Sequence, residues 1–178
     1  MNIHPWHDIE PTTEAIDTFN AIVEIPKNSR AKYELEKKSG LLKMDRVLYS
    51  AMYYPTNYGF IPQTLSEDGD PLDILVFSQI AIEPLCLVEA TVIGAFKMLD
   101  EGKADDKIIA VAKNDMSVNH VKDVSGLAEH YHREIKNFFE EYKKLENKKV
   151  LVNELLGKEA ALKVIKKDRL NYINTFMK

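Results

Sequence analysis

The first two-thirds of the chain have the hydrophobic pattern of β-structure. Short runs rich in Val, Ile and Leu alternate with polar positions and are separated by turn residues, as in a sheet of short strands. We expect strands at residues 19–25, 30–36, 46–52, 72–77, 85–98 and 108–112. Turn signals lie at residues 26–28, 39–40, 68–69 and 101–102.

The pattern changes to a helical period after about residue 120. Apolar side chains then recur at intervals of three and four, which is one face of an amphipathic helix with Ser125 as its N-cap. They are Leu127, Tyr131, Ile135, Phe138, Tyr142 and Leu145. A second helix is expected at residues 158–176, with Leu162, Ile165, Tyr172 and Phe176 on one side. Strands followed by helices predict a mainly β (α+β) fold, a closed or partly closed barrel with helices packed outside it.

Composition indicates one globular domain over residues 1–178. Apolar residues make up 45% and charged residues 29%, and no repeat or Gly/Ser-rich linker divides the chain. A chain of this length buries roughly two-thirds of its unfolded surface, so it can fold without disulfides. The single cysteine, Cys86, cannot pair within the chain, which favours a reducing compartment. Because Cys86 lies in a β-like run, we expect it in the core.

Charge and hydropathy favour a cytoplasmic protein. The N-terminus lacks the basic start and apolar run of a secretion signal, and no apolar run approaches the ~20 residues that span a bilayer. The formal net charge of −4 argues against a protein that binds nucleic acid through bulk electrostatics.

The densest group of chemically useful side chains is the acidic run Asp68-Gly69-Asp70-Pro71-Leu72-Asp73. Pro71 prevents a regular helix, so the run is extended or turned and its three carboxylates lie close together. Hard divalent cations such as Mg²⁺ prefer oxygen ligands of this kind. A solvated acidic turn is the alternative. An EF-hand calcium loop is excluded by spacing, because Asp73 stands where that loop requires glycine.

A second acidic group follows at residues 100–107, with Asp100, Asp105 and Asp106 beside Lys103 and Lys107. Taken alone, it is typical of a polar hairpin turn. Both acidic groups lie at the ends of strong β segments, however, and one end of a barrel could bring them together.

Alternating charges occur earlier, at Glu24, Lys32, Glu34, Asp45 and Arg46. In an extended segment residues i and i+2 share a face, so the side chains of Lys32 and Glu34 point the same way. A ladder of surface charges would have the same pattern.

An aromatic run at residues 53–60 is unusual for a loop. We expect Tyr53 and Phe60 to pack against the barrel, while tyrosine hydroxyls at its open end could donate to phosphate oxygens. On the first helix, the pattern alone favours a core position for Tyr142 and a solvated one for Lys143.

Other catalytic motifs are missing from the sequence. There is no phosphate-binding loop of the G-x-x-x-x-G-K-[ST] type, no G-x-S-x-G turn and no H-E-x-x-H. His130 and His132 are two residues apart on a predicted helix and so face different ways, which favours surface positions over a paired metal site.

Taken together, these groups resemble family I soluble inorganic pyrophosphatases. The likeness runs from about Glu24 to Lys143, and residues 68–73 followed by Ile74 match the family's D-x-D-P-x-D motif. The resemblance implies a five-stranded OB-like barrel with two helices. It also implies Mg²⁺-dependent hydrolysis of pyrophosphate to two phosphates and a homo-oligomer, often a hexamer.

The resemblance also implies roles for individual residues. Metal ligands would be Asp68, Asp73, Asp100, Asp105 and Glu34, with Glu24 in support. Phosphate-binding groups would be Lys32, Arg46, Tyr58, Lys107, Tyr142 and Lys143, with Tyr54 in the surrounding hydrogen-bond network. Asp70 resembles the base that takes a proton from the attacking water.

A charge balance then predicts that metal is obligatory. Seven carboxylates against four cationic side chains leave the implied site at −3, which repels a pyrophosphate anion unless three or four divalent ions bind. Two other functions remain open: a barrel that binds nucleic acid with basic and aromatic residues, and a relative that binds metal without catalysis.

Overall fold

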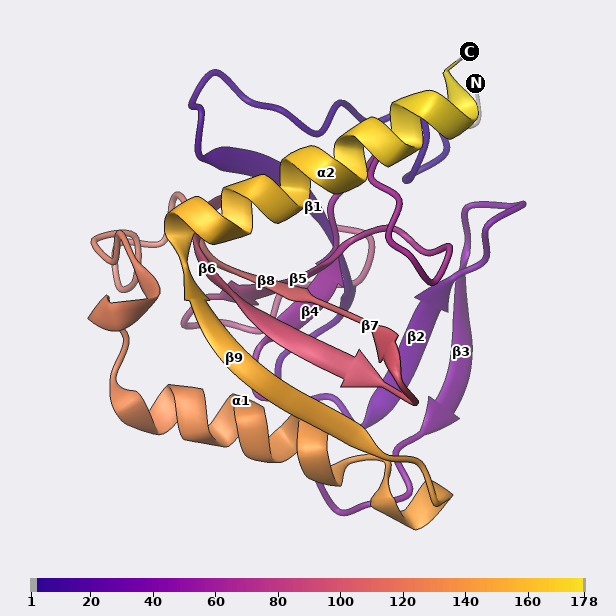
Figure 1. Ribbon diagram of the computed structural model, residues 1–178, viewed down its shortest axis with the longest axis vertical. Helices are drawn as coiled ribbons and strands as arrows, with labels where there is room; N and C mark the ends of the chain where they lie inside the picture. The colour runs from indigo at the N-terminus through magenta and orange to yellow at the C-terminus, as the bar shows by residue number, and fades with distance from the viewer. Residues whose placement is uncertain (1–2, 178) are drawn as a thin grey trace.

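Five strands close into a ring in the computed structural model, which describes residues 3–177 (Figure 1). The strands are β1 (Thr18–Ile25), β4 (Asn57–Phe60), β5 (Asp73–Phe77), β8 (Lys107–Ala112) and β6 (Leu87–Asp100), in that order. Pairing of β6 with β1 closes the ring. The β5–β8 pair is parallel and the other pairs are antiparallel. The expected five-stranded OB-like barrel is thus confirmed.

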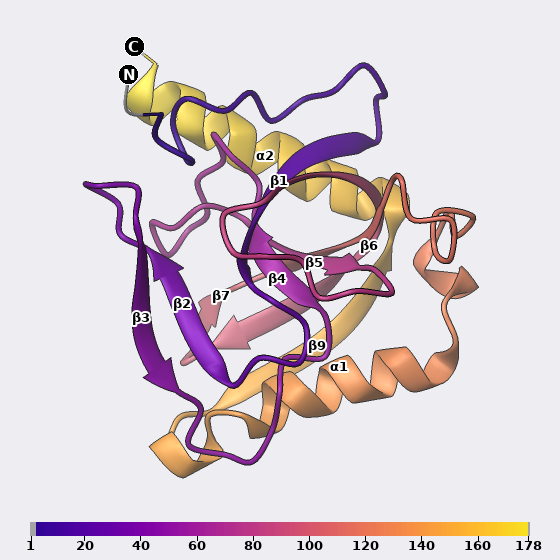
Figure 2. The same ribbon diagram turned by 180° about the vertical axis from the view of Figure 1, so that it is seen from behind.

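The other elements extend or cover this barrel. They are the hairpin β2 (Ala31–Leu35) and β3 (Leu42–Val47), strands β7 (Lys103–Ala104) and β9 (Val150–Gly157), helices α1 (Glu129–Glu141) and α2 (Lys158–Phe176), and the 3₁₀ turns η1 (Val124–Gly126) and η2 (Lys144–Glu146). The two helices lie on opposite sides of the barrel in both views (Figures 1 and 2). No helix within residues 3–177 is both long and apolar enough to cross a bilayer.

Period-two alternation in the strands separates two hydrophobic clusters. Leu75 and Ile109 pack in the cluster that includes the buried side chains of α1. Their neighbours Ile74 and Ile108 face the other way, into the cluster that includes α2. Every position of β8 is therefore buried, which explains why this strand is a continuous apolar run.

The pairing of β1 with β4 requires a glycine at position 59. A Cβ atom there would lie 1.9 Å from the carbonyl oxygen of Ile22, so no other residue fits without a backbone shift. A bulge between Val23 and Ile25 leaves Glu24 as the extra residue of β1. Residues 57–60 form β4, so the aromatic loop expected at residues 53–60 is wrong for its second half.

The predicted strand at residues 46–52 is also wrong, since β3 spans Leu42–Val47. The turn before it sets this register. Gly40 donates its N–H to the carbonyl oxygen of Glu36 at 2.9 Å and has a φ of +70°, which pairs Leu35 with Leu42. From that pair β3 runs to Val47, which pairs with Ala31, the first residue of β2.

The first helix begins later than predicted. Ser125 lies in the 3₁₀ turn η1, where Asp123 is the cap, and the N-cap of α1 is Ala128. Because α1 ends at Glu141, Leu145 lies beyond the helix and is 66% exposed. Tyr131 lies within α1 but is also exposed, so neither residue belongs to the buried face that the pattern predicted. Ile135, Phe138 and Tyr142 are buried as expected.

Three further residues that were expected to be packed are exposed in the structure. The second helix has the predicted bounds, Lys158–Phe176, although Phe176 is exposed. Cys86 is exposed, because it precedes β6 rather than lying within it. Tyr53 is exposed as well, whereas Phe60 is fully buried as predicted. Strand β9, which pairs with β6, was not predicted at all.

Candidate active site

Strand direction brings the acidic segments to one end of the barrel. Asp73 and Lys107 are the first residues of the parallel strands β5 and β8, and the sheet register pairs them directly. Asp100 ends β6, which is antiparallel to β8 and so finishes at the same end. Glu101 and Gly102, both with positive φ, form the turn that follows Asp100.

A cavity of about 440 Å³ opens at this end. Its carboxylates are Glu24, Glu34, Asp68, Asp70, Asp73, Asp100 and Asp105. Its lysines are Lys32, Lys37, Lys107 and Lys143, and its tyrosines are Tyr33, Tyr54, Tyr58 and Tyr142. Every residue predicted for the site lines this cavity except Arg46, so two acidic segments do meet at one end of the barrel.

Lys107 lies between two of these carboxylates. Its side chain is 4% exposed and its Nζ pairs with Asp73 and, at 2.5 Å, with Oδ1 of Asp105. Burial disfavours the charged ammonium, but the two carboxylates outweigh it, so the pKa of Lys107 lies above its usual value. Burial raises the pKa of Asp73 to about 6, in spite of Lys107.

The bulge in β1 turns Glu24 into the cavity. Its side chain is nearly buried and its Oε1 accepts a hydrogen bond from the backbone N–H of Leu35 at 2.7 Å. Burial, with repulsion from Asp73 and Glu34, raises the pKa of Glu24 to about 8. The folded protein therefore holds the proton on Glu24 more tightly than a solvent-exposed glutamate would.

The acidic loop before β5 is held by short-range and cross-loop contacts. The backbone N–H of Asp70 donates to Oδ1 of Asp68 at 3.0 Å, and Gly69 between them has a φ of +88°. From the β2–β3 turn, Lys37 pairs with the carboxylate of Asp70 and donates to the carbonyl oxygen of Gly69 at 3.0 Å. Burial raises the pKa of Asp68.

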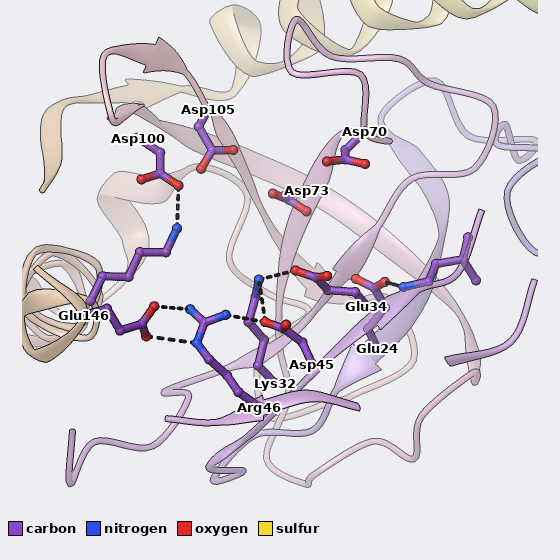
Figure 3. Close-up of polar contacts among 12 residues, drawn as sticks. Glu24, Lys32, Glu34, Asp45, Arg46, Asp70, Asp73, Asp100, Asp105 and Glu146 are labelled. Atoms are coloured by element: carbon purple, nitrogen blue, oxygen red, sulfur yellow. Dashed lines mark hydrogen bonds and ion pairs between the residues drawn. The ribbon is translucent and has the colours of Figure 1, made fainter. Parts of the chain in front are cut away.

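The hairpin β2–β3 supplies the opposite side of the cavity. Lys32 and Glu34 form an ion pair, which confirms that their side chains share one face, and Lys32 also lies 3.6 Å from Asp45. Figure 3 shows Glu34 and Glu24 lying toward the carboxylates of Asp73 and Asp70. Glu24, Lys32 and Glu34 therefore line the cavity and are not simply part of a ladder of surface charges.

The end of α1 adds Tyr142 and Lys143. Lys143 is buried and its Nζ donates to Oδ2 of Asp100 at 2.5 Å, so the solvated position that the helical pattern favoured is wrong. Tyr142 is buried as expected, and it stacks on Phe138 while still lining the cavity.

Burial raises the pKa values of Tyr54, Tyr58 and Tyr142 well above 10. For Tyr58 and Tyr142, repulsion from nearby carboxylates adds to this effect. The three phenols are therefore protonated at neutral pH and able to donate hydrogen bonds.

Arg46 does not line the cavity but lies at its edge, close enough to act on the charges of Tyr54 and Tyr142. Its guanidinium pairs with Asp45 and with Glu146, Nε lying 2.9 Å from Oε1 and Nη2 2.9 Å from Oε2 of Glu146. Burial disfavours the charge, but the contacts with Glu146 and Asp45 together outweigh it, so the pKa of Arg46 is raised.

Sequence reasoning missed two of these partners, Glu146 and Lys37, because neither belongs to a motif. The two histidines considered earlier lie elsewhere: His130 is exposed, and Nε2 of His132 lies 3.0 Å from the carbonyl oxygen of Val124.

The donor set fits hard divalent cations. Within residues 3–177 no three acidic, histidine or cysteine side chains converge closely enough to enclose an ion, because ammonium groups lie between the carboxylates. The buried Oδ1 of Asp100 has no hydrogen-bond partner. An unpaired carboxylate oxygen in an oxygen-rich cavity with a formal charge of −3 is suited to bind Mg²⁺.

Comparison with known proteins gives a consistent result. A family model described as inorganic pyrophosphatase matches residues 21–173. The chain is 54% identical to soluble inorganic pyrophosphatase 3 of Arabidopsis thaliana, over 91% of this chain and 75% of that one. The structure resembles inorganic pyrophosphatase from Thermus thermophilus, with a TM-score of 0.90, 37% identity and coverage of 97% and 99%. It also resembles the enzyme from Helicobacter pylori, with a TM-score of 0.87, 45% identity and coverage of 92% and 98%.

Proposed function

Since this chain belongs to the inorganic pyrophosphatase family and is an inorganic diphosphatase, we propose that it hydrolyses pyrophosphate with a Mg²⁺-activated water in the acidic cavity. The observation that supports this most strongly is the lining of that cavity, where seven carboxylates and four lysines surround about 440 Å³. The carboxylates suit the cations, and the lysines and tyrosines suit phosphate oxygens.

We assign the metal ligands to Asp68, Asp73, Asp105, Asp100 and Glu34, with Glu24 in support, for three to four ions during turnover. When bound, divalent cations would supply a water whose pKa falls from ~15.7 toward ~7, and they would offset the charge on the phosphoryl oxygens. Because Lys107 pairs with Asp73 and Asp105, its ammonium would become free to bind phosphate when bound cations take those carboxylates as ligands.

The proton of the attacking water goes to the carboxylate of Asp70. This residue lines the cavity and is 53% exposed, so it can receive a proton and pass it to solvent. Lys32, Lys107, Lys143 and Arg46 then bind the phosphates as cations, while Tyr58 and Tyr142 donate hydrogen bonds as neutral phenols. Tyr54, buried beside Tyr58, supports this network.

A matched pair of substitutions tests the assignment of the ligands. Asp105→Asn should raise the Mg²⁺ concentration needed for phosphate release and lower the turnover, because a cavity carboxylate is lost. Asp106→Asn is the control, since Asp106 is outside the cavity and its Oδ1 accepts a bond from Met98 N–H that asparagine can keep. Equal behaviour of the two variants would contradict the proposal.

Assembly and location stay predictions from the family resemblance. We propose a homohexamer in the cytoplasm and a single pyrophosphatase domain over residues 1–178. Light scattering on the purified protein at micromolar concentration tests the hexamer, and a monomer mass would refute it.

A further inference from the structure

Glu146 and Arg46 join two parts of the chain that are 100 residues apart in sequence. Figure 3 shows the two parallel contacts between their planar groups, each 2.9 Å long. The side chains are only 19% and 10% exposed, for Arg46 and Glu146 respectively. Two bonds between planar groups fix the orientation of a guanidinium far better than one bond does.

The turn that carries Glu146 is itself well defined. Glu146 donates its N–H to the carbonyl oxygen of Lys143 at 2.9 Å, closing the 3₁₀ turn η2. Asn147 follows in the left-handed region with a φ of +57°, which asparagine tolerates better than most residues. Its N–H donates to the carbonyl oxygen of Lys144 at 3.0 Å. The Glu146 carboxylate therefore starts from a fixed backbone.

Both sides of the cavity meet at this contact. Arg46 is paired directly with Lys32 in the β2–β3 register, and Lys32 lines the cavity. Lys143, three residues before Glu146, lines the opposite side and binds Asp100. The Glu146–Arg46 contact thus ties the hairpin cations to the cations at the end of α1.

We propose that Glu146 is a positioning residue that holds the guanidinium of Arg46 at the edge of the cavity, ready to bind pyrophosphate. The inference rests on the proposed function, in which Arg46 binds phosphate. Without Glu146, the long side chain of Arg46 has to be ordered when the substrate arrives. That cost falls on the bound substrate and the transition state alike, so it weakens binding and leaves the chemical step nearly unchanged.

The first test is the kinetics of Glu146→Gln at saturating Mg²⁺. Glutamine keeps the shape but loses one of the two contacts, so we expect KM for pyrophosphate to rise about 3–10-fold. We expect kcat to stay within about twofold of wild type. An unchanged KM, or a fall in kcat alone, would overturn the proposal.

A matched control is Glu141→Gln, the same chemical change at the end of α1. Glu141 pairs with Lys144 at 2.5 Å and makes no contact with Arg46, so its variant should keep the wild-type KM. An equal rise in KM for both variants would overturn the specific role of Glu146.

A double mutant separates positioning from a general effect on the fold. Arg46→Met removes the guanidinium and keeps an apolar stem. If Glu146 acts through Arg46, adding Glu146→Gln to Arg46→Met raises KM no further. A further multiplicative rise would overturn the proposal, because it would mean that Glu146 acts by another route.

Nuclear magnetic resonance provides a readout that needs no activity. The Nε–H of Arg46 should give a slowly exchanging signal, identified by its loss in Arg46→Met. We expect exchange clearly faster than in wild type for Glu146→Gln, because one of the two contacts is lost, and exchange as slow as in wild type for Glu141→Gln. Slow exchange in both would overturn the positioning role, whereas failure of the wild-type protein to hydrolyse pyrophosphate would overturn the proposed function instead.

Discussion

Glu24→Gln should change the pH dependence of stability in the metal-free protein. The Glu24 carboxyl is 7% exposed, and burial with repulsion from Asp73 and Glu34 raises its pKa from 4.5 to about 8. The folded state therefore binds this proton more tightly than the unfolded state does. Between those two pKa values, stability falls as the pH rises, because ionisation favours the unfolded chain.

The size of the effect follows from the pKa difference. Each pKa unit corresponds to about 1.4 kcal/mol, so this one residue should lower the stability by about 4 kcal/mol between about pH 5 and pH 8. Glutamine cannot ionise, and its side-chain oxygen can still accept the bond from Leu35 N–H. The stability of the variant relative to wild type should therefore rise by that amount over the same range.

Urea unfolding in excess EDTA at several pH values measures the free energy of unfolding of both proteins. Subtracting one pH curve from the other removes the contribution of the titratable groups that the two proteins share. Glu154→Gln, the same change at an exposed position on β9, is the control, and the pH-dependent difference should be specific to Glu24→Gln. A difference between Glu24→Gln and wild type that does not change with pH would contradict this prediction, since it would mean that the pKa of Glu24 is the same in the folded and unfolded states.

Three further substitutions test other parts of the account. Asp70→Asn should lower turnover by ~10²–10⁴-fold while the circular dichroism spectrum is kept, and wild-type turnover in the folded variant would remove Asp70 from the mechanism. Lys107→Met should lower metal-free stability by about 3–5 kcal/mol, because Asp73 and Asp105 lose their buried partner. Saturating Mg²⁺ should reduce that loss, and an equal loss with and without Mg²⁺ would contradict the shared role of these carboxylates. Gly59→Ala should cost more than ~4 kcal/mol, since its Cβ would lie 1.9 Å from the carbonyl oxygen of Ile22, and a Tm close to wild type would contradict this.

The fold could be predicted where the local pattern and the tertiary structure agree. The buried strands β5, β6 and β8 are apolar runs bounded by turn residues, and α2 has the bounds that its period indicates. The predictions failed where a tertiary contact decides. Strand β4 is four residues long and depends on the close approach at Gly59, and the register of β3 depends on the turn at Gly40.

The candidate site could be predicted as a set of residues through the family resemblance, because each acidic or basic group taken alone also fits a surface turn or a ladder of surface charges. Their pairing could not. Arg46 points to Glu146, and Lys37 pairs with Asp70, through contacts between segments far apart in sequence. Lys143 is buried against Asp100 although its helical position favoured solvent. Such contacts follow from packing rather than from any local sequence pattern.

The central claim is that this cavity hydrolyses pyrophosphate only with divalent metal. Phosphate release from pyrophosphate should be measured with millimolar Mg²⁺, with excess EDTA, and with ATP in place of pyrophosphate. We expect rapid release with Mg²⁺, none with EDTA, and ATP left largely intact, because the small charged cavity fits pyrophosphate better than a bulky ester. Release that continues in EDTA, or no release by the folded, Mg²⁺-loaded protein, would contradict it.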